Sequence, residues 1–520
     1  MKRSISQRLS STLGFVIAIT SLLTVVHAAE KKQNMLLISV DDLNNWALVR
    51  DDYPQLKTPN IDRIRQGGVT FLDAHCAAPV CAPSRASMMS GRLPNTTGFY
   101  TNFQGTNIHE AVTTPHLMEL FRNNGYKTYG AGKIYHEWLC DDHQPEKYYD
   151  DFMPIQDIKW DYYQLKRGDG YLGFKFYPFP KNGTKILREF GSKGGTSLSA
   201  GPIAREDMTR GLMPDEMITE FAVKTLQRKE DEPFFLAVGY LRPHVPYTAP
   251  TKYFDKFPIK DLELPPVTKM QDIPVFGKAM AYGMADGGDQ HVVDGLGEDY
   301  AKELLQGYLA CISFIDDEIG KVLKALEVNG HWDNTVIALY SDHGQNFGQK
   351  KNWRKMSLWQ DSTAMPLVVR VPGNNANGKS CLRTVGLIDL YPTLAELCNL
   401  GAVDYVDGVS LVPLIKNPSL EWEKPTLVTW KYRNFAVLKE GWRYITYRDG
   451  SEELYNRKID PLEHQNLAHN PEFKQVKEML KKALPKEPSL PYKTTEWKGD
   501  DLERLIKKWE SDGEPTFYNN

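Results

Sequence analysis

The sequence has few cysteines, little excess charge and one apolar stretch of notable length. Six cysteines in 520 residues are too sparse for a disulfide scaffold. The 63 basic and 66 acidic side chains leave a formal net charge of −3, so no overall field favours nucleic acid or an acidic membrane surface. The chain shows no internal repeat. A hydrophobic content of 41% over this length suffices for a large core and more than one structural unit.

The apolar stretch lies at the N-terminus and has the composition of a targeting segment. Lys2, Arg3 and Arg8 form a positive start, and residues 13–26 are apolar but too few to span a bilayer comfortably. We therefore expect a signal peptide over residues 1–28 and an exported protein, periplasmic or secreted. The alternative is an uncleaved anchor. No other stretch is long and apolar enough to cross a membrane, so no membrane contact is expected after cleavage.

Apolar runs of strand length alternate with amphipathic stretches of helical period along most of the chain. This alternation predicts an α/β fold with a mostly parallel sheet covered by helices on both faces. Polar clusters follow the C-terminal ends of the expected strands, where open α/β sheets bind ligands. The expected strands include residues 35–40, 125–130, 233–238 and 335–340, and the expected helices include 59–65, 114–123 and 300–327.

The pattern changes after residue 414. Residues 426–447 alternate in the manner of short antiparallel strands, and residues 472–484 have the period of an amphipathic helix. A smaller α+β subdomain with an antiparallel sheet is therefore expected after the main domain. The predicted division is a signal peptide over 1–28, a main N-terminal domain over 29–415, a C-terminal subdomain over 416–485, and a charged, loosely held tail over 486–520.

Acidic side chains come directly after two of the expected strands. Asp41 and Asp42 follow the first, and Asp342 with His343 follows another. Three carboxylates gathered at one sheet edge repel each other unless a cation neutralises them. Oxygen ligands suit Ca²⁺ or Mg²⁺ better than zinc. Taken singly, each acid pair has the alternative of being a solvated surface pair.

Cys81 lies in the stretch VCAPSRASMMSGRLP, at the start of an expected small-residue helix. By itself it has the alternative of being a buried, inert thiol, the usual state of a free cysteine. Pro83 favours helix initiation, which would place Cys81 near the positive end of a helix dipole, where anions bind. The run from Cys81 to Arg85 resembles the sulfatase signature C-x-P-S-R, in which the cysteine is oxidised to formylglycine, an aldehyde.

Further motifs strengthen this resemblance over most of the chain. The chain resembles the formylglycine-dependent (type I) sulfatases and, within them, is most similar to iduronate-2-sulfatases, which share the His after the metal-binding Asp and the Lys-x-x-His spacing. The resemblance implies an alkaline-phosphatase-like fold, a mostly parallel sheet sandwiched by helices. The motifs occur in family order as LISVDD, TPNIDRI, CAPSRASMMSGR, GKIYH, RPHVP, SDHGQNFG and WRKMS.

The resemblance also implies a metal centre and roles for single residues. One Ca²⁺, in preference to Mg²⁺, would be bound by Asp41, Asp42, Asp342, His343 and the 3-oxoalanine (formylglycine) made from Cys81. Arg85 would stabilise the aldehyde hydrate, Lys133 and His136 would contact the hydrate and the sulfate, Lys355 would contact the sulfate, and His244 would protonate the leaving alcohol. Arg242 and Trp353 would touch the sugar. Taken singly, a histidine or a lysine is more often structural or solvated.

The activity implied is hydrolysis of a sulfate ester on a carbohydrate. A hydrated aldehyde carries two hydroxyls on one carbon, so one can attack sulfur while the other expels sulfate, which a serine cannot do. The favoured substrate is a 2-O-sulfated uronic acid of a glycosaminoglycan or a similar polysaccharide. A formylglycine-generating or other sulfatase-maturing enzyme would be an obligatory partner. The sequence leaves the oligomeric state open.

Two departures from iduronate-2-sulfatases fall where substrate selection is made. The stretch QNFGQKKNW after Gly344 lacks their Glu-His pair, and residues 140–215 and 255–298 are expected to form long loops that do not align. The alternatives are therefore a sulfatase for another glycan, such as an algal galactan, fucan or ulvan, a phosphonate or phosphodiester hydrolase of the same superfamily, and a glycan-binding protein with an inactive site.

Overall fold

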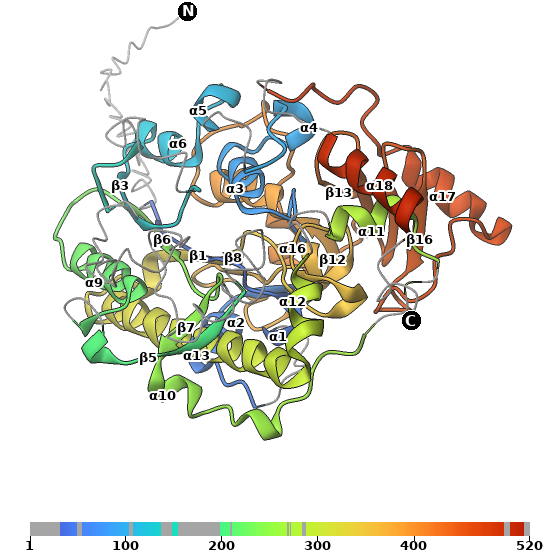
Figure 1. Ribbon diagram of the computed structural model, residues 1–520. Helices are drawn as coiled ribbons and strands as arrows, with labels where there is room; N and C mark the ends of the chain where they lie inside the picture. The colour runs from blue at the N-terminus through green and yellow to red at the C-terminus, as the bar shows by residue number, and fades with distance from the viewer. Residues whose placement is uncertain are drawn as a thin grey trace, which may run out of the picture. The chain divides into compact units, whose positions relative to one another are not determined.

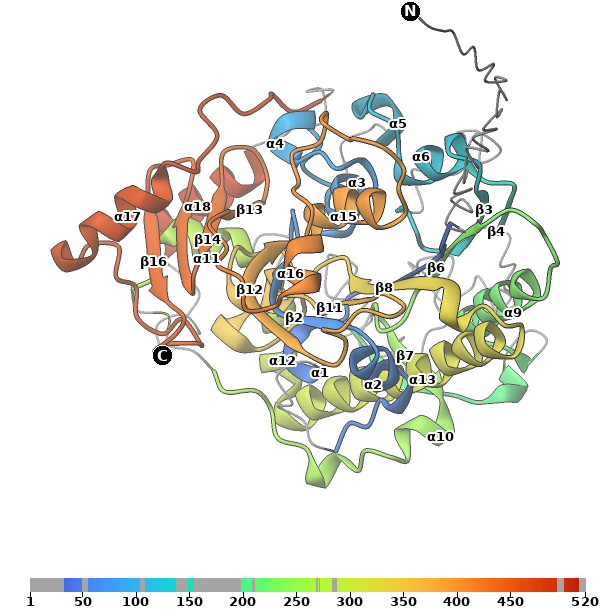
Figure 2. The same cartoon turned by 180° about the vertical axis from the view of Figure 1, so that it is seen from behind.

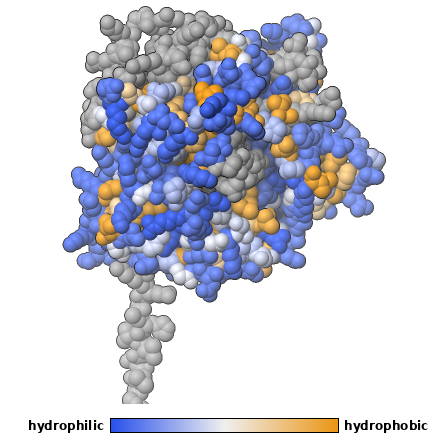
Figure 3. Space-filling view, turned by 90° about the horizontal axis from the view of Figure 1, so that it is seen from below, coloured by the Kyte–Doolittle hydropathy of each residue, from blue (hydrophilic) through white to orange (hydrophobic). Residues whose placement is uncertain are grey.

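The computed structural model describes residues 32–48, 55–102, 108–136, 148–153, 198–207, 211–267, 270, 272–282, 288–492 and 500–513. The expected signal peptide, Cys140 and most of the loop over residues 140–215 lie outside these residues. The cysteines described are Cys76, Cys81, Cys311, Cys381 and Cys398, and all five are free. Within the described ranges, no helix has the length and apolar character needed to cross a membrane. The face in Figure 3 is mainly hydrophilic, with apolar residues in small separate groups.

An eight-stranded sheet lies at the centre of the unit that begins at Gln33. Its order is β12-β2-β11-β8-β1-β6-β3-β4, and β11 runs against its neighbours β2 and β8, whereas the other pairs are parallel. The mostly parallel sheet predicted from the sequence is confirmed. The strands are β1 (Asn34–Val40), β2 (Val69–His75), β3 (Lys127–Gly132), β4 (Asp151–Met153), β6 (Phe234–Tyr240), β8 (Thr335–Ser341), β11 (Leu367–Arg370) and β12 (Ser380–Gly386).

The central strands are buried on both faces, which explains their unbroken apolar sequences. Alternate residues enter two hydrophobic cores: Leu36 and Ile38 belong to one, Met35 and Leu37 to the other. Different helices cover each face, as Figures 1 and 2 show. The first core is covered by α2 (Pro59–Gln66), α9 (Pro214–Leu226) and α13 (Glu298–Val328), and the second by α3 (Cys81–Ser90), α6 (Leu117–Asn123), α15 (Leu390–Leu397) and α16 (Val412–Lys416).

A four-stranded antiparallel sheet forms the C-terminal part, as the alternating sequence predicts. Helix α17 (Lys474–Lys481) packs on this sheet, and Leu480 of the helix shares a small core with Val437, Tyr444 and Leu454 of the strands. The strands are β13 (Thr426–Thr429), β14 (Phe435–Lys439), β15 (Trp442–Thr446) and β16 (Glu452–Asn456).

Two segments differ from the sequence expectation. The expected loop over residues 255–298 contains helices α11 (Val275–Tyr282) and α12 (Gly288–Leu296), and the expected loose tail contains helix α18 (Asp500–Asp512). Leu502 and Trp509 of α18 are buried, and the Trp509 ring lies edge-on to Tyr282 of α11. Apolar residues seven positions apart in a charged stretch form one narrow stripe, which is enough to hold α18 on α11.

The remaining described elements are short. They are α1 (Asn45–Leu48), α4 (Pro94–Thr97), α5 (Ile108–Ala111), α10 (Thr251–Phe254), α14 (Gln360–Thr363), β5 (Ala200–Ile203), β7 (Tyr247–Pro250), β9 (Asn346–Phe347), β10 (Trp353–Arg354) and the 3₁₀ turns Arg205–Asp207, Ile259–Asp261, Trp332–Asn334, Gln349–Lys351, Leu387–Asp389 and Pro471–Phe473.

A buried ion pair within the C-terminal subdomain is hydrogen-bonded to the segment 350–360 of the main domain. Arg443 of β15 donates to Glu463 Oε1 at 2.5 Å, and both side chains are fully buried. Arg443 also donates to the Leu358 carbonyl at 2.7 Å and to Gln360 Oε1 at 2.6 Å. Lys350 Nζ donates to the Glu463 carbonyl at 2.6 Å. The C-terminal subdomain therefore fixes both ends of a segment that contains Lys355.

Replacing Arg443 with methionine is expected to lower the free energy of unfolding by about 3–5 kcal/mol, because the Glu463 carboxylate would stay buried without its partner. Chemical denaturation measures this change. As a control, Lys439→Met removes the largely exposed pair with Glu423 and should cost less than about 1 kcal/mol. An Arg443→Met protein as stable as the wild type would show that the pair does not hold the subdomain.

Candidate active site and metal centre

Polar side chains from several elements meet at the carboxyl edge of the central sheet. Asp41 and Asp42 follow β1, Lys133 follows β3, and Asp342 with His343 follows β8. These five side chains are at most 3% exposed. The adjacency of β6, β1 and β8 in the sheet brings residues that are 300 positions apart in the chain into contact, as in the bond from the Asp42 amide to Asp342 Oδ1 at 3.2 Å.

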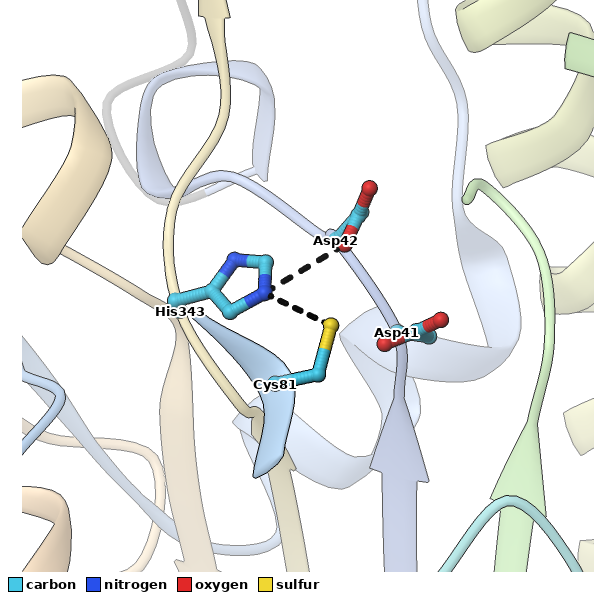
Figure 4. A group of neighbouring side chains, drawn as sticks. All are labelled: Asp41, Asp42, Cys81 and His343. Atoms are coloured by element: carbon cyan, nitrogen blue, oxygen red, sulfur yellow. Dashed lines mark hydrogen bonds and ion pairs between the residues drawn. The ribbon is translucent and has the colours of Figure 1, made fainter. Parts of the chain in front are cut away.

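Cys81 lies at the centre of this group. Its Sγ is 3.3 Å from His343 Nε2, 3.6 Å from Lys355 Nζ and 3.7 Å from Lys133 Nζ. Figure 4 shows the Cys81 and Asp42 side chains approaching the same ring nitrogen of His343, Nε2, from two directions. Burial raises the pKa of the Cys81 thiol, although the two lysines lower it. The unmodified residue is therefore a protonated thiol and a weak nucleophile.

Helix α3 presents Cys81 at its first position. Val80 before it is extended, and Asn102 Oδ1 accepts a hydrogen bond from the Ala82 amide at 2.9 Å. Pro83 occupies the third helical position rather than the first. Its missing N–H still costs nothing, because the amides of the first turn have no partner within the helix. All ten residues of α3 are buried, so position 81 is held rigidly near the positive end of the helix dipole.

Arg85 connects the ends of three strands. Its Nε donates to Asp342 Oδ2 at 2.9 Å, and its Nη2 donates to Asp41 Oδ1 at 3.0 Å. Its Nη1 donates to Ser39 Oγ at 3.1 Å and to the Lys133 carbonyl. In the described part of the chain, none of its hydrogen bonds goes to Cys81. Arg85 therefore positions the carboxylates, and the contact with the aldehyde hydrate that the resemblance implies stays a prediction.

Each lysine of the site is paired with one of the adjacent aspartates. Lys133 Nζ lies 2.5 Å from Asp41 Oδ2, and Lys355 Nζ donates to Asp42 Oδ1. Gly132 allows the first contact, because it has φ +78° and a Cβ there would lie 2.2 Å from the Gly239 carbonyl oxygen. Burial alone would raise the pKa of the Asp41 carboxyl, but Lys133 and neighbouring cations hold it well below its usual range.

Asp42 is held in an uncommon conformation. Its φ is +61°, and Tyr308 of α13 donates to its carbonyl at 2.8 Å. Burial raises the pKa of its carboxyl; Lys355 lowers it, but the Asp41 carboxylate raises it further. Among the described residues, Asp42 Oδ2 has no hydrogen-bond partner although it is buried. A buried carboxylate oxygen in this state is suited to a cation that the side chains around it do not supply.

Four residues of the site fit a divalent cation. Ligand atoms of Asp41, Asp42, Cys81 and His343 lie within 4.8 Å of one another. His343 Nδ1 donates to the Gly344 carbonyl at 2.9 Å, so Nε2 carries the lone pair of the neutral ring and faces the other ligand atoms. Asp342 lies beside this group, with its Oδ2 3.6 Å from His343 Nε2, and its oxygens accept from Arg85 and the Asp42 amide.

Two further histidines lie within electrostatic reach of the lysines. His244 donates from Nδ1 to the Val245 carbonyl at 2.7 Å, which leaves Nε2 as its other ring nitrogen. Burial, together with Lys355 and Lys133, keeps the pKa of His244 well below its usual value. Burial and Lys133 lower the pKa of His136 in the same way. Both rings are therefore neutral near neutral pH in the protein without a bound anion.

The loop that carries His244 is fixed by Arg242, which the sequence suggested for sugar contact, and by Asp215, which the sequence did not mark. Arg242 is fully buried and donates to the His244 carbonyl at 2.9 Å and to the Thr248 carbonyl at 2.9 Å, so it stabilises this loop, and its contact with a sugar stays a prediction. Asp215 at the start of α9 accepts from the Leu241 amide at 2.6 Å. Neither Asp215 nor Tyr308 has a motif that marks it, because each acts through a backbone contact distant in the chain.

Comparison with known proteins identifies the family. A family model described as Sulfatase matches residues 33–400, and one described as N-sulphoglucosamine sulphohydrolase, C-terminal, matches residues 348–489. A sulfatase of Formosa agariphila is 36% identical over 471 residues, covering 88% of this chain and 87% of that protein. Iduronate 2-sulfatase of Mus musculus is 28% identical over 418 residues, covering 72% of this chain and 70% of that protein.

Solved structures confirm the fold. A phosphonate monoester hydrolase from Silicibacter pomeroyi superposes with a TM-score of 0.69 at 19% identity, covering 87% of this chain and 94% of that protein. A likeness at this identity concerns architecture alone. The family model, by contrast, extends over more than half of the chain and includes the strand ends and the helix start that make up the site. The chain belongs to the sulfatase family.

Proposed function

We propose that this sulfatase removes a sulfate ester from a sulfated carbohydrate, with an aldehyde made from Cys81 as its nucleophilic group. The position of Cys81 carries the proposal. Its Sγ lies within 3.7 Å of two lysine ammonium groups and 3.3 Å from the His343 ring, at the first residue of a buried helix. Two cations and a helix N-terminus around one side chain suit a bound sulfate.

Oxidation of Cys81 supplies what the unmodified side chain lacks. The raised pKa of the buried thiol leaves it protonated, and a protonated thiol does not attack sulfur effectively. The hydrated aldehyde offers two hydroxyls on one carbon, one for displacement of the sugar alcohol and one for release of sulfate. Lys133 and Lys355 would neutralise the sulfate oxygens, and His136 would lie beside them. A sulfatase-maturing enzyme would act on the chain, which residues 1–28 would direct out of the cytoplasm.

The metal centre would be held by Asp41, Asp42, His343 and the oxygen at position 81, with Asp342 adjacent. With a thiol at position 81 the donors would include sulfur and imidazole, a set that suits zinc. With an oxygen there, oxygen donors dominate and Ca²⁺ is favoured, so oxidation of Cys81 also sets the choice of metal. The cation would add positive charge where the sulfate binds and lower the pKa of a bound hydroxyl.

His244 is the proposed proton donor to the leaving alcohol. Because Nδ1 is engaged by the Val245 carbonyl, the transferable proton would be on Nε2, which carries one only in the imidazolium form. Burial and the two lysines disfavour that form in the free site. A bound sulfate adds negative charge beside the ring and raises its pKa, so substrate binding itself would charge the donor.

The favoured substrate is a 2-O-sulfated uronic acid of a glycosaminoglycan or similar polysaccharide. The similarity to iduronate 2-sulfatase supports this choice. A panel of defined disaccharides that differ in the sugar and in the sulfate position tests it, with released sulfate as the readout. Turnover confined to a galactan, fucan or ulvan fragment would favour another sulfated glycan. Faster cleavage of an aryl phosphate diester than of an aryl sulfate would assign the site to phosphoester chemistry.

Replacing Cys81 with alanine is expected to lower kcat/KM by about 10⁴-fold or more, because the group proposed to attack sulfur is lost. Cys398→Ala, which removes another buried free thiol, should retain activity. The mass of the peptide around residue 81 in active protein should show the thiol side chain replaced by an aldehyde, with loss of the sulfur and of two hydrogens and gain of one oxygen. A fully unmodified thiol in protein that turns over sulfate esters would contradict the proposed nucleophile.

Removal of the metal is expected to abolish turnover and to lower Tm by a few degrees, since a cation bound only by the folded protein stabilises it by about 2.7 kcal/mol at a hundred times its Kd. Added Ca²⁺ should restore both. Asp42→Asn should lose most of the Ca²⁺-dependent rise in Tm, whereas Asp317→Asn, at a half-buried carboxylate outside the site, should keep it. Unchanged Tm and turnover after thorough chelation would argue against the metal centre.

Replacing His244 with glutamine should lower kcat/KM for a sugar sulfate by about 10²–10⁴-fold. The effect on 4-nitrophenyl sulfate should be slight, since 4-nitrophenolate leaves without a proton. In the wild type, kcat/KM for the sugar sulfate should fall as pH rises through the lowered pKa of His244, because only the protonated ring donates. Equal losses on both substrates would exclude this role, and the exposed His464→Gln serves as control.

A further inference from the structure

A second cavity adjoins the active site. It is a small hollow lined by residues of α11, of α12 and of the segment 351–356. Lys355 lies between the pocket and the active site. It lines the pocket, and its ammonium lies 3.6 Å from Cys81 Sγ and pairs with Asp42. A charged substituent of a sugar whose sulfate is held at Cys81 could therefore reach this pocket along Lys355.

The pocket carries excess positive charge. Three cationic side chains and one carboxylate line it. The carboxylate, Asp289, is engaged by Arg354 through two hydrogen bonds of 2.5 and 2.8 Å, and Lys355 is paired with Asp42 outside the pocket. The half-buried Lys351 makes no ion pair or side-chain hydrogen bond within the part of the chain that is described. An anion entering this pocket would find one ammonium without a counter-charge.

The backbone that carries Lys351 is held in a conformation that non-glycine residues rarely adopt. Lys350, Lys351, Arg354 and Met356 have φ between +49° and +79°. Each such residue costs on the order of 1 kcal/mol, and such strain gathers at ligand sites. Hydrogen bonds from the Lys351 amide to the Gly348 carbonyl at 3.0 Å, and from Lys350 Nζ to the Glu463 carbonyl, maintain it. The segment is thus built to keep Lys351 at the pocket.

Aromatic walls complete the pocket. Trp353 is fixed by a hydrogen bond from Nε1 to Gln290 Oε1 at 2.9 Å, and Tyr282 is supported from behind by Trp509 of α18. Ring faces beside cationic groups are suited to a sugar that carries an anionic substituent. The stretch that departs from iduronate-2-sulfatases, QNFGQKKNW, contains both Lys351 and Trp353.

We propose that this pocket binds a second anionic group of the substrate, a carboxylate or a sulfate on the same or the next sugar, and that Lys351 determines this specificity. The inference rests on the proposed function, because the first anion is the sulfate ester at Cys81. It deepens that function by assigning a residue to the second anionic group: the sulfate ester is cleaved at Cys81, and the other anionic group is held by Lys351.

The test compares Lys351→Met and Lys351→Arg with the wild type and with Lys324→Met, which removes an exposed lysine of α13. Four substrates are used: a sulfated disaccharide with a uronic acid, the same disaccharide with its carboxyl reduced, a disaccharide with a second sulfate, and 4-nitrophenyl sulfate. Lys351→Met should raise KM about tenfold for a substrate with the second anion and leave kcat close to unchanged. Lys351→Arg should keep most of the affinity, because it keeps the charge.

The four substrates show which anionic group the pocket binds, and they distinguish a failure of this inference from a failure of the proposed function. Whichever of the uronic acid and the second sulfate loses affinity in Lys351→Met is the group that the pocket binds. Equal KM changes on all substrates, 4-nitrophenyl sulfate included, or no change on any, would overturn the inference while leaving the sulfatase proposal intact. A wild type that cleaves 4-nitrophenyl sulfate but no dianionic sugar would also overturn it. A wild type inactive on every sulfate ester would overturn the proposed function itself.

Discussion

The active site depends on the Arg85 guanidinium. It is the one described side chain that forms ion pairs with both Asp41 and Asp342, two carboxylates from neighbouring strands in a fully buried space, and it offsets the repulsion between them. Its bond to the Lys133 carbonyl adds the end of a third strand. Because α3 also presents Cys81, one helix both supplies the reactive position and fixes the groups around it. The register of that helix against the sheet therefore sets the geometry of the whole site.

The charges of the site are balanced before any ligand binds. Three carboxylates, Asp41, Asp42 and Asp342, face three cations, Arg85, Lys133 and Lys355. A divalent cation bound among the carboxylates would leave an excess of positive charge in a buried space. An anionic substrate is what offsets that excess, so metal binding and sulfate binding would favour each other. The lysines that pair with Asp41 and Asp42 would then be available to the sulfate.

The chemistry could be predicted from the sequence because it follows strand ends. Asp41, Asp342 and Lys133 come directly after apolar runs, and a parallel sheet brings such positions to one edge. The role of Arg85 could not be predicted, since a signature names a residue but not its hydrogen bonds. Tyr308 and Asp215 were missed for a related reason. Both contact the backbone of a segment far away in the chain, and no local spacing reports such a contact.

Predictions were weakest in the segments that shape the substrate pocket. Helices α11 and α12 were expected to be loop because Gly, Pro and Asp are frequent around them, and α18 was expected to be a loose tail. These elements are stabilised by contacts with one another, as in the Trp509–Tyr282 pair, rather than by strong local periodicity. Tertiary packing, rather than the local sequence pattern, therefore determines that these three segments are helical.

This contrast separates the molecule into two functional parts. The reacting groups stand on the ends of buried strands and on a fully buried helix, where small changes in the outer chain do not reach them. The pocket beside them is built from the segment 351–356, whose backbone is anchored through Lys350 and Arg443 to the C-terminal subdomain. Substitutions in that subdomain are therefore expected to act on both parts through Lys355, which lines the pocket and also pairs with Asp42 beside Cys81.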